Sequence, residues 1–492
     1  MHLAKRSYPS RDSRLFVIGF LASMKKLFTD YLVVGSGAMG MAFTDALLAE
    51  SDANIVIVDK HHQPGGHWND AYPFVRLHQP SAFYGVNSRK LGKNTVDLTG
   101  LNAGLYELAT NGEVCSYFDQ VMQQQFLPSG RVQYFPGCEY VGNGEFVSSL
   151  SGLKYSVSFK KEVDSTYMNV VVPSKRSPPF KIEGNADCVP LNDLPSLTNR
   201  HDDYVIVGAG KTAIDAALFL LKNTVSPERI RWIMPRDSWI LDRAQIQPTF
   251  ESIGKLFASR IVPGTESKTV DDFFEKVSKA GGLLRIDDKV KPKMYRCSTV
   301  TLAELEQLRR INKIVRKGRV KIIDNDKIVL EEGSIPTTLR TLHIDCAGDG
   351  LAKKPPVPIF ENQKIVLQSV RTCQQVFSAA LLGYVEANYP ENEKKNALCK
   401  PVPHPNDDID FLKNTLADSL NRENWAREPK LSKWLQESRL NPESHVLKGS
   451  YKLKVLSLFG KIPFLKLPNR VLEVQRKANE NIEKLIDSLG AQ

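Results

Sequence analysis

The stretch Tyr31–Asp59, YLVVGSGAMGMAFTDALLAESDANIVIVD, decides the fold of this chain. An apolar, β-prone run at Tyr31–Val34 leads into a helical pattern at Met41–Leu48, and a second strand pattern follows at Ile55–Val58. Between the first strand and the helix stand three glycines with the spacing G-x-G-x-x-G, which are Gly35, Gly37 and Gly40. Strand, glycines, helix and strand in this order predict a Rossmann-like unit.

Each residue type in this unit suits the binding of a dinucleotide. Gly35 permits the tight turn, Gly37 lets a pyrophosphate approach the backbone, and Gly40 lets the helix pack closely on the strand. Free N–H groups and the positive dipole end at the helix start can hold phosphates, and Asp59 can accept hydrogen bonds from ribose hydroxyls. The alternative is a strand–helix turn with a purely structural role. The predicted contacts are Gly35, Gly37, Ala38, Met39, Gly40, Asp59 and Lys60.

The same pattern returns at Tyr204, in YVIVGAGKTAIDAALFLL. The second strand of this unit, Arg231–Met234, is followed by Pro235 and Arg236 rather than by an acid. A guanidinium binds a 2′-phosphate in a fork and a carboxylate repels it, so this site is predicted to take NADP (NADPH). Asp237 follows directly and keeps NAD open as the alternative. The predicted contacts are Gly208, Gly210, Lys211, Thr212 and Arg236.

The loop after Asp59 reads HHQPGGHWNDAYPFVRLHQP and offers further candidate contacts. Gly66 and Trp68 are predicted to lie beside a flavin, with Trp68 as a flat apolar wall. The alternative is an ordinary loop with a core tryptophan. His78 and Gln79 are the candidate catalytic residues, His78 as a general acid or base, and the alternative for His78 is a structural role.

The composition is that of an ordinary globular protein, with 42% apolar and 25% charged residues. At 492 residues the chain is long enough for two or three domains. The net charge of +11 is mostly scattered, so no nucleic-acid partner is predicted. The apolar run Leu15–Met24 is too short to span a membrane, and no other segment approaches that length. Residues 1–23 are interpreted as an N-terminal extension, either signal-like or upstream of a natural start at Met24.

Seven cysteines occur, an odd number, and no two of them have the spacing of a C-x-x-C motif. This pattern indicates a reducing compartment such as the cytoplasm, and it argues against a disulfide framework and a zinc site. It also predicts that the chain lacks the redox-active disulfide of a flavin disulfide reductase. No metal site is predicted.

Secondary structure beyond the two units is expected as follows. Short strands at Val132–Phe135, Glu145–Leu150, Tyr155–Phe159 and Met168–Val172 indicate a β-meander, and Pro173–Leu197 has the composition of a connector. Helices are predicted at Leu105–Gln125, Val270–Lys279, Ala303–Ile314, Gln374–Tyr389, Asp408–Leu420 and Leu472–Leu489, and a hairpin at Val320–Ile323 with Lys327–Glu331. Trp239 and Arg243 are interpreted as a packing residue and a solvated charge.

Two later segments allow two interpretations each. In Thr341–Asp349, TLHIDCAGD, either Asp349 binds the ribityl hydroxyls of a flavin, or the chain turns here from the second unit back to the first. No obvious helix begins after Asp349, which favours the turn. Tyr451–Arg470 mixes lysines with apolar residues, and it either contacts a membrane surface or covers an apolar patch of the main body, which is favoured.

Two dinucleotide units in one chain, the first with an acid and the second with an arginine, indicate FAD and NADPH and a hydride transfer between them. The predicted fold class is α/β, with two Rossmann-like dinucleotide-binding domains, a β-meander and a helical C-terminal extension. The predicted order is an extension at 1–23, an FAD-binding domain at 24–198 with the meander, an NADP-binding domain at 199–340, a second part of the FAD-binding domain at 341–390 and the helical extension at 391–492.

Several motifs resemble the flavin-containing monooxygenase superfamily. They are G-x-G-x-x-G near the start, P-G-G-x-W after the acid, and GAGKTAID followed by WIMPRDSW. The resemblance covers most of residues 30–387. It implies FAD phosphates at the first glycines, flavin contacts at Gly66, Trp68 and Gln79, and NADP phosphates at Gly208 and Gly210. The fingerprint F-x-G-x-x-x-H between the glycine motifs is missing, which places the chain in a monooxygenase-like subgroup.

The resemblance implies an NADPH-dependent FAD monooxygenase that uses oxygen to oxygenate a small organic substrate through a peroxyflavin. Because the missing fingerprint couples nicotinamide binding to oxygen chemistry, two alternatives stay open. One is a reductase or dehydrogenase that passes electrons to a quinone or another acceptor. The other is a non-catalytic, nucleotide-binding redox sensor.

Overall fold

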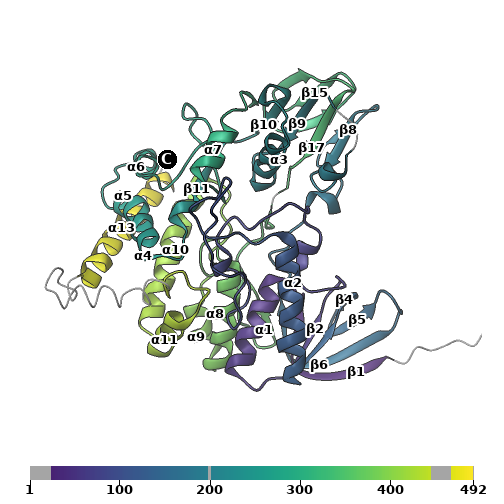
Figure 1. The fold of residues 1–492 in the computed structure, drawn as a ribbon. Helices are drawn as coiled ribbons and strands as arrows, with labels where there is room; N and C mark the ends of the chain where they lie inside the picture. The colour runs from purple at the N-terminus through teal and green to yellow at the C-terminus, as the bar shows by residue number, and fades with distance from the viewer. Residues whose placement is uncertain (1–23, 198–200, 349, 445–466, 491–492) are drawn as a thin grey trace, which may run out of the picture.

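The computed structural model describes residues 24–197, 201–348, 350–444 and 467–490. Two α/β lobes and a mainly helical third part make up this structure (Figure 1). The N-terminal extension, Asp349 and most of Tyr451–Arg470 lie outside the described residues. No helix within the described ranges is long and apolar enough to cross a bilayer.

The first lobe, here called the first module, is built on a seven-stranded sheet in the order β3-β2-β1-β6-β5-β4, with β18 also paired to β6. β1, β2, β3, β6 and β18 run parallel, whereas β5 is antiparallel to both β4 and β6, which confirms the predicted β-meander. The strands are β1 (Lys25–Val34), β2 (Ile55–Val58), β3 (Val132–Phe135), β4 (Cys138–Gly142), β5 (Glu145–Ser148), β6 (Lys154–Asp164) and β18 (Lys364–Val366).

Two helices far apart in sequence form the core of the first module. α1 (Ala38–Glu50) follows the first glycine turn, and α8 (Gln375–Asn388) packs against it (Figure 1). A methyl group at Gly383 would lie 2.6 Å from the carbonyl oxygen of Phe43, so the glycine is what allows this close approach. Both helices are buried along most of their length, as their apolar composition requires.

α2 (Asn111–Val121) begins later than the predicted helix Leu105–Gln125. The side chain of Thr110 accepts a hydrogen bond from the backbone N–H of Glu113, and the Glu113 carboxylate accepts one from the backbone N–H of Thr110. This capping box satisfies the first N–H groups of the helix and ends the preceding loop at this point.

The second lobe, the second module, contains a five-stranded parallel sheet in the order β13-β10-β9-β17-β8. α3 (Lys211–Lys222) and α7 (Leu302–Leu308) share its apolar core. The strands of this sheet are β8 (Asp187–Pro190), β9 (Asp203–Val207), β10 (Ile230–Ile233), β13 (Lys313–Val315) and β17 (Thr341–Asp345). The predicted fold class, with two Rossmann-like domains, is therefore confirmed.

Two smaller sheets accompany the second module. One has the order β16-β15-β14-β7, and its antiparallel β14 and β15 confirm the predicted hairpin. The other is the parallel pair β11 and β12. The strands are β7 (Lys181–Ile182), β11 (Ser238–Asp242), β12 (Met294–Val300), β14 (Val320–Ile323), β15 (Lys327–Leu330) and β16 (Gly333–Pro336).

The second sheet takes in two strands that lie outside the predicted NADP-binding range 199–340. β8 falls within the predicted connector Pro173–Leu197, and β17 falls within the range 341–390, yet β17 pairs with both β8 and β9. The boundaries at 198/199 and 340/341 are thus wrong at these strands, because pairing with a distant strand rather than local composition decides membership of a sheet. After β17 the chain passes to β18 in the first sheet, as the favoured interpretation of Thr341–Asp349 expects, and Asp349 itself lies outside the described residues.

Two further local predictions are wrong. Met168–Val172 forms no strand and is turn and irregular structure. The predicted helix Ala303–Ile314 ends at Leu308, and Lys313–Val315 becomes β13, where Ile314 pairs with Trp232 of β10. In both cases tertiary pairing, or its absence, overrides the local pattern.

The third part is mainly helical, as predicted for residues 391–492, and it recruits helices from the middle of the chain (Figure 1). α13 packs against α10 and α5, and the side-chain amide of Asn481 donates to the carbonyl oxygens of Gly264 and Ser267, both at 2.8 Å. Its helices are α4 (Phe250–Leu256), α5 (Val262–Gly264), α6 (Val270–Lys279), α9 (Asn392–Leu398), α10 (Asp408–Ala426), α11 (Pro429–Glu437) and α13 (Leu467–Gly490).

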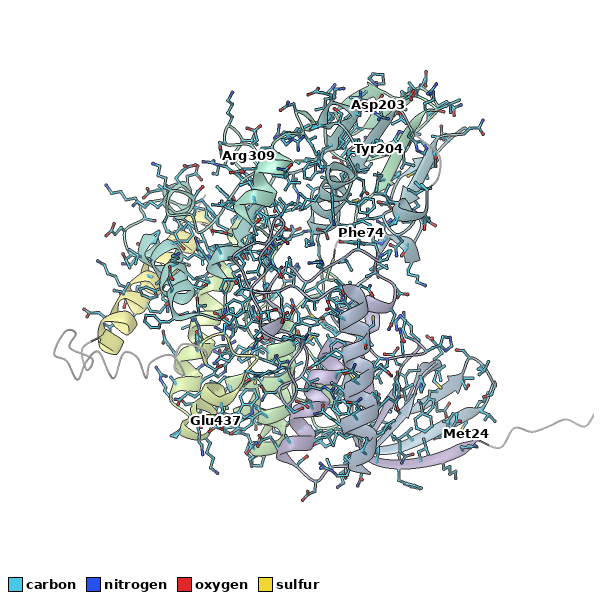
Figure 2. All side chains as sticks on the ribbon, viewed as in Figure 1. Met24, Phe74, Asp203, Tyr204, Arg309 and Glu437 are labelled. Carbon is cyan, nitrogen blue, oxygen red and sulfur yellow. A yellow bond between two sulfur atoms is a disulfide. The ribbon has the colours of Figure 1, made fainter. Side chains whose placement is uncertain are left out.

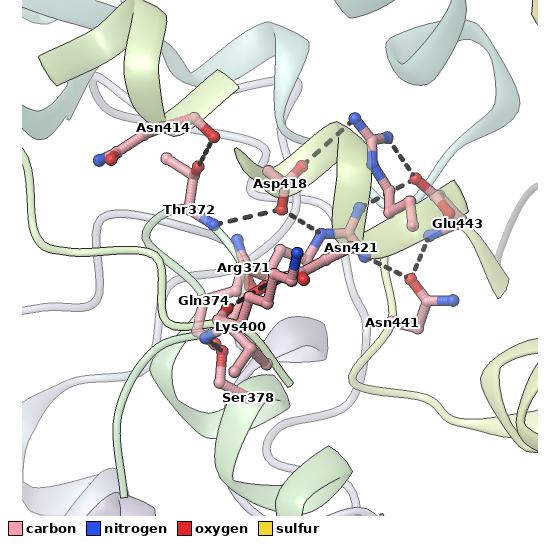
Figure 3. A network of polar contacts seen from close by, with 12 residues as sticks. Arg371, Thr372, Gln374, Ser378, Lys400, Asn414, Asp418, Asn421, Asn441 and Glu443 are labelled. Carbon is pink, nitrogen blue, oxygen red and sulfur yellow. Dashed lines mark hydrogen bonds and ion pairs between the residues drawn. The ribbon is translucent and has the colours of Figure 1, made fainter. Parts of the chain in front are cut away.

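A cluster of charges fastens this helical part to the segment before α8 (Figure 3). The guanidinium of Arg371 donates to the carboxylate of Glu443 at 3.0 Å, and Arg422 donates to the same oxygen at 2.9 Å. Arg422 also pairs with Asp418 at 3.2 Å, and the backbone N–H of Thr372 donates to Asp418 at 3.3 Å. The C-terminal helices therefore hold the backbone that leads into α8.

We expect acid to weaken the fold through Glu443. Burial raises the pKa of this carboxyl, but Arg371 and Arg422 outweigh burial and lower the pKa to about 2, below the ordinary 4.5. Because the folded-state pKa is depressed, the stabilisation is present above the ordinary pKa and is lost as the pH falls towards the folded-state value. In thermal denaturation, the Tm of Glu443→Gln should be lower than that of the parent at neutral pH. Between roughly pH 5 and 3, the Tm of this variant should fall less than the Tm of the parent.

The exposed Glu437 provides the matched control. Glu437→Gln should have the Tm of the parent at neutral pH, and its Tm should fall as much as that of the parent on acidification. If the Tm of Glu443→Gln fell as much as that of the parent on acidification, the assigned role of this cluster would be contradicted.

Candidate functional site

The first glycine turn leaves the start of α1 open to a ligand. Gly35 has a φ of +99°, which favours glycine, and no side chain caps α1 at Gly37. A methyl group at Gly40 would lie 2.1 Å from the carbonyl oxygen of Gly35, so only glycine lets the helix begin here. The turn thus has uncapped N–H groups and the positive end of a helix dipole, which suit a phosphate.

Gly65 and Gly66 lie against this first turn. The N–H of Gly65 donates to the carbonyl oxygen of Ser36 at 2.9 Å, and a methyl group at Gly66 would lie 2.8 Å from the Cα atom of Gly37. Gly66, a predicted flavin contact, is therefore placed beside the predicted phosphate turn. Trp68 is buried, and its indole N–H donates to the hydroxyl of Tyr84 at 2.7 Å, as the core-tryptophan alternative describes.

Asp59 lies at the end of β2 and is buried. Its carboxylate accepts hydrogen bonds from the backbone N–H and hydroxyl of Ser36 and from the backbone N–H of His61, and it pairs with the His61 ring at 3.0 Å. Burial raises the pKa of Asp59, but these bonds outweigh burial and lower it. The neighbouring Lys60 is exposed. A ribose hydroxyl that binds Asp59 must therefore replace one of the Ser36 or His61 contacts.

The second glycine turn has the same form and more room. Gly208 has a φ of +128°, and a methyl group there would lie 2.6 Å from the carbonyl oxygen of Cys346. At Gly210, which precedes α3, a methyl group would have no atom within 4 Å. Lys211 pairs with Asp215 within α3, and Thr212 follows it in the first turn. The space in front of Gly210 is open to a phosphate.

The segment that follows Asp59 reaches across to α3 and joins the two modules. The hydroxyl of Tyr72 donates to Asp215 at 2.5 Å, and the ring of Phe74 stacks on Phe219 with centroids 4.2 Å apart. Figure 2 shows Phe74 where the two lobes meet. Tyr72 belongs to the core of the second module although it is a residue of the first. The relative position of the two glycine turns is therefore set by packed side chains.

Three arginines gather where β10 ends. Arg236 and Arg296 both donate to the side-chain oxygen of Asn406, at 3.1 and 2.7 Å. Asp237, which left the choice of nicotinamide cofactor open, is bound in a fork by Arg316 at 2.8 and 2.9 Å. The carboxylate beside Arg236 is thus neutralised. Sequence reasoning missed Arg296 and Arg316, because Arg316 comes beside Asp237 only through the pairing of β13 with β10.

Gln79 and His78 lie at the junction of the modules. The side-chain oxygen of Gln79 accepts a hydrogen bond at 2.9 Å from Gln374, the residue that precedes α8. Burial, then the charges of Lys211 and Arg243, lower the pKa of His78 to about 3, and its Nδ1 has no hydrogen-bond partner among the described residues. His78 is therefore neutral at physiological pH, and it serves better as a hydrogen-bonding group than as a proton donor.

Arg243 is buried, with 2% of its surface exposed, so its interpretation as a solvated charge is wrong. Its guanidinium donates to the carbonyl oxygens of His78 at 3.1 Å and Thr299 at 3.2 Å, and it pairs with Glu304 at 2.9 Å. These partners come from three distant segments, which a local sequence pattern does not reveal. Trp239 is fully buried, and its packing role is confirmed.

A cavity of about 320 Å³ opens between the segment after β6 and the segments before α8 and α10. At one side it is lined by Tyr167. Two residues earlier, the hydroxyl of Ser165 donates to the carbonyl oxygen of Gly35 at 2.7 Å. At the other side it is lined by Asn406, the partner of Arg236. Two lining side chains, Ser369 and His404, hold buried polar atoms without a hydrogen-bond partner among the described residues. Such atoms suit a polar ligand that completes their bonds.

Residues 33–85, which hold the first glycine turn and Asp59, match the family described as "NAD(P)-binding Rossmann-like domain". The fold is also similar to that of a flavin-containing monooxygenase from Stenotrophomonas maltophilia (13% identity, 76% of this chain and 99% of that chain, TM-score 0.41). A second similar structure is a steroid monooxygenase bound to NADP (13% identity, 73% and 85% covered, TM-score 0.46).

Much closer relatives exist in mycobacteria. Uncharacterised proteins of Mycobacterium tuberculosis and Mycobacterium bovis are 50% identical over 448 residues, which cover 89% of this chain and 83% of theirs. Identity at this level over this length means that most of this chain is shared with these proteins. The chain therefore belongs to the same protein family as these mycobacterial proteins.

Proposed function

We propose that this protein is an NADPH-dependent, FAD-containing oxidoreductase that works as a monooxygenase on a small organic substrate. The observation that carries the proposal is the junction of the modules. Tyr72 and Phe74 of the first module pack on α3 of the second, and His78 lies close enough to Lys211 for the lysine charge to lower its pKa. A dinucleotide on each glycine turn would therefore extend towards one shared region.

FAD is assigned to the first module. The uncapped start of α1 suits its pyrophosphate, and Asp59 stands where the ribose hydroxyls of a dinucleotide are bound in this fold. The cavity lined by Tyr167 also holds Ser369 and His404, whose unpartnered polar atoms suit the polar edge of a flavin ring. Burial and the charge of Arg296 lower the pKa of His404 to about 4, so it offers a neutral ring.

NADPH is assigned to the second module. Gly210 leaves open space for the pyrophosphate, and Arg236 stands just after β10, where the 2′-phosphate would lie. The fork of Arg316 on Asp237 removes the repulsion that this acid would exert. The charge balance at the end of β10 therefore favours a phosphate over a bare ribose.

The flavin, when bound, supplies the hydride acceptor and the chemistry with oxygen. The chain contributes position and a dry site. The glycine turns hold the phosphates, Arg243 anchors the His78 carbonyl, and Gln374 holds Gln79 beside the start of α8. The lowered pKa of His78 leaves its ring neutral, so it can orient a polar group by a hydrogen bond. The cytoplasmic location stays a prediction.

Stopped-flow absorbance tests this proposal. NADPH mixed with the oxidised holoprotein without oxygen should bleach the flavin, and oxygen should then produce a transient that absorbs between the oxidised and reduced spectra. Bleaching without that transient would favour a reductase or dehydrogenase that uses a quinone or another acceptor. No bleaching at all would favour a nucleotide-binding redox sensor.

We expect Arg236→Ala to weaken NADPH far more than NADH. Loss of a forked contact with a phosphate removes about 1.5–3 kcal/mol, or roughly 10- to 150-fold in Kd for NADPH. The Kd for NADH, which lacks the 2′-phosphate, should change less than about threefold. Titration of the flavin spectrum with each nucleotide measures both constants. The exposed Arg310 supplies the control, and equal losses for the two nucleotides in Arg236→Ala would refute the role.

A further inference from the structure

Two cysteines that no sequence motif brings together meet at the junction of the modules. Cys297 on β12 and Cys373, two residues before α8, form a disulfide, with Cα atoms 6.4 Å apart and a separation of 76 positions in sequence. The cysteine pattern argued against disulfides in this chain, and this bond is the exception to it. The C-x-x-C spacing detects only cysteines that are close in sequence. This pair instead arises because β12 packs beside the segment that enters α8.

The residues next to both cysteines contact the candidate flavin site. Gln374, adjacent to Cys373, donates to Gln79 at 2.9 Å. Arg296, adjacent to Cys297, donates to Asn406, which lines the cavity that also holds Ser369 and His404. Figure 3 shows Gln374 and Arg371 on the two sides of Cys373 in the sequence, within the network that fixes this segment. The pair therefore joins two segments whose neighbouring residues contact Gln79 and the cavity-lining Asn406.

The backbone of both cysteines is in a conformation that L-residues rarely adopt. Cys297 has a φ of +58° and Cys373 a φ of +57°. Three of the other four non-glycine residues with positive φ in the described part are asparagines, which tolerate this region. Held strain of this kind gathers at functional sites.

The two sulfurs differ in access. Cys297 is buried in an apolar cluster with Trp239 and Phe274, with 4% of its surface exposed, whereas Cys373 is half-buried. Cys373 also stands near the N-terminus of α8, whose positive dipole end favours a thiolate. This asymmetry, with one shielded and one accessible sulfur, suits a pair that is reduced and reoxidised.

We propose that Cys297 and Cys373 are a redox-active pair that takes up the electrons of NADPH, an inference that rests on the proposed function. FAD held by the first module would supply the two-electron chemistry that connects NADPH with the disulfide. In the overall step NADPH gives a hydride and becomes NADP⁺, the S–S bond breaks, and one proton from solvent completes two thiols. NADPH is the reductant and the disulfide is the oxidant, so the step balances without another reactant.

An anaerobic titration of the holoprotein with NADPH tests the pair. The parent should consume about two equivalents of NADPH per flavin, one for the flavin and one for the disulfide, because each is a two-electron couple. Thiols labelled with a maleimide under denaturing conditions and counted by mass should rise from the five free cysteines to all seven. Cys373→Ser and Cys297→Ser should each consume about one equivalent and show no rise.

The free, half-buried Cys188 on β8 gives the matched control, since Cys188→Ser should still consume about two equivalents. Bleaching by one equivalent with the thiol count unchanged would overturn the pair and leave the proposed function standing. Failure of NADPH to bleach the flavin would contradict the proposed function instead. In that case light with EDTA reduces the flavin directly, and a rise in thiols would support the pair, whereas an unchanged count would overturn it.

Discussion

Gly40→Ala is expected to prevent the chain from folding into a stable holoprotein. A methyl group at this position would lie 2.1 Å from the carbonyl oxygen of Gly35, which is backbone held between β1 and α1. Neither atom can rotate away, so the turn or the helix must shift, at a cost of about 3 kcal/mol or more. Soluble yield, Tm and the flavin content per chain should all fall together.

Gly37→Ala separates binding from folding at the same turn. A methyl group at Gly37 would have its nearest neighbour at 3.6 Å, an ordinary contact, and would stand at the uncapped start of α1. The apoprotein should keep the parent's Tm, while flavin content falls because the methyl takes the space of the pyrophosphate. A Gly40→Ala protein with the parent's Tm, or a Gly37→Ala protein with full flavin content, would contradict these assignments.

Gly210→Val should abolish reduction by NADPH while leaving the flavin in place. A methyl group at Gly210 would meet no atom within 4 Å, and the φ of this residue is −88°, so valine fits the folded chain. The valine would fill the space assigned to the NADPH pyrophosphate, and the Kd for NADPH should rise by about 100-fold or more, or roughly 3 kcal/mol. Anaerobic stopped-flow should show no rapid bleaching by NADPH.

Two controls confine this effect to the second module. Reduction of the same variant by dithionite should be normal, because dithionite needs no nucleotide site. Gly112→Val, at an equally open glycine in α2, should retain NADPH-driven bleaching. Rapid bleaching of Gly210→Val by NADPH would show that the nucleotide binds elsewhere.

Much of the fold could be predicted because its signals are local. Glycines at fixed spacing, apolar runs of strand length and a terminal acid or arginine all lie within about thirty residues of one another in each unit. The strand β8 could not be predicted in this way. Its residues lie within a segment that has the composition of a connector. They form a strand because they pair in register with β17 at the edge of the second sheet.

In the candidate site, too, local signals predicted some residues and missed others. Asp59 and Arg236 follow directly from the ends of their strands, and the structure places both there. The fork of Arg316 on Asp237 and the burial of Arg243 between His78, Thr299 and Glu304 could not be read from spacing, because their partners are brought together by different segments.

By itself the amino-acid sequence determined two Rossmann-like units, the order of their elements and the residue types at their phosphate turns, because hydrophobic period, glycine geometry and capping act over a few residues. Only the tertiary structure decided what lies between the units. The Tyr72 and Phe74 bridge, the Arg371–Glu443 cluster and the Cys297–Cys373 pair each join positions far apart in sequence. Such contacts arise when burial of apolar surface brings distant segments together, and no local pattern records which partner each will meet.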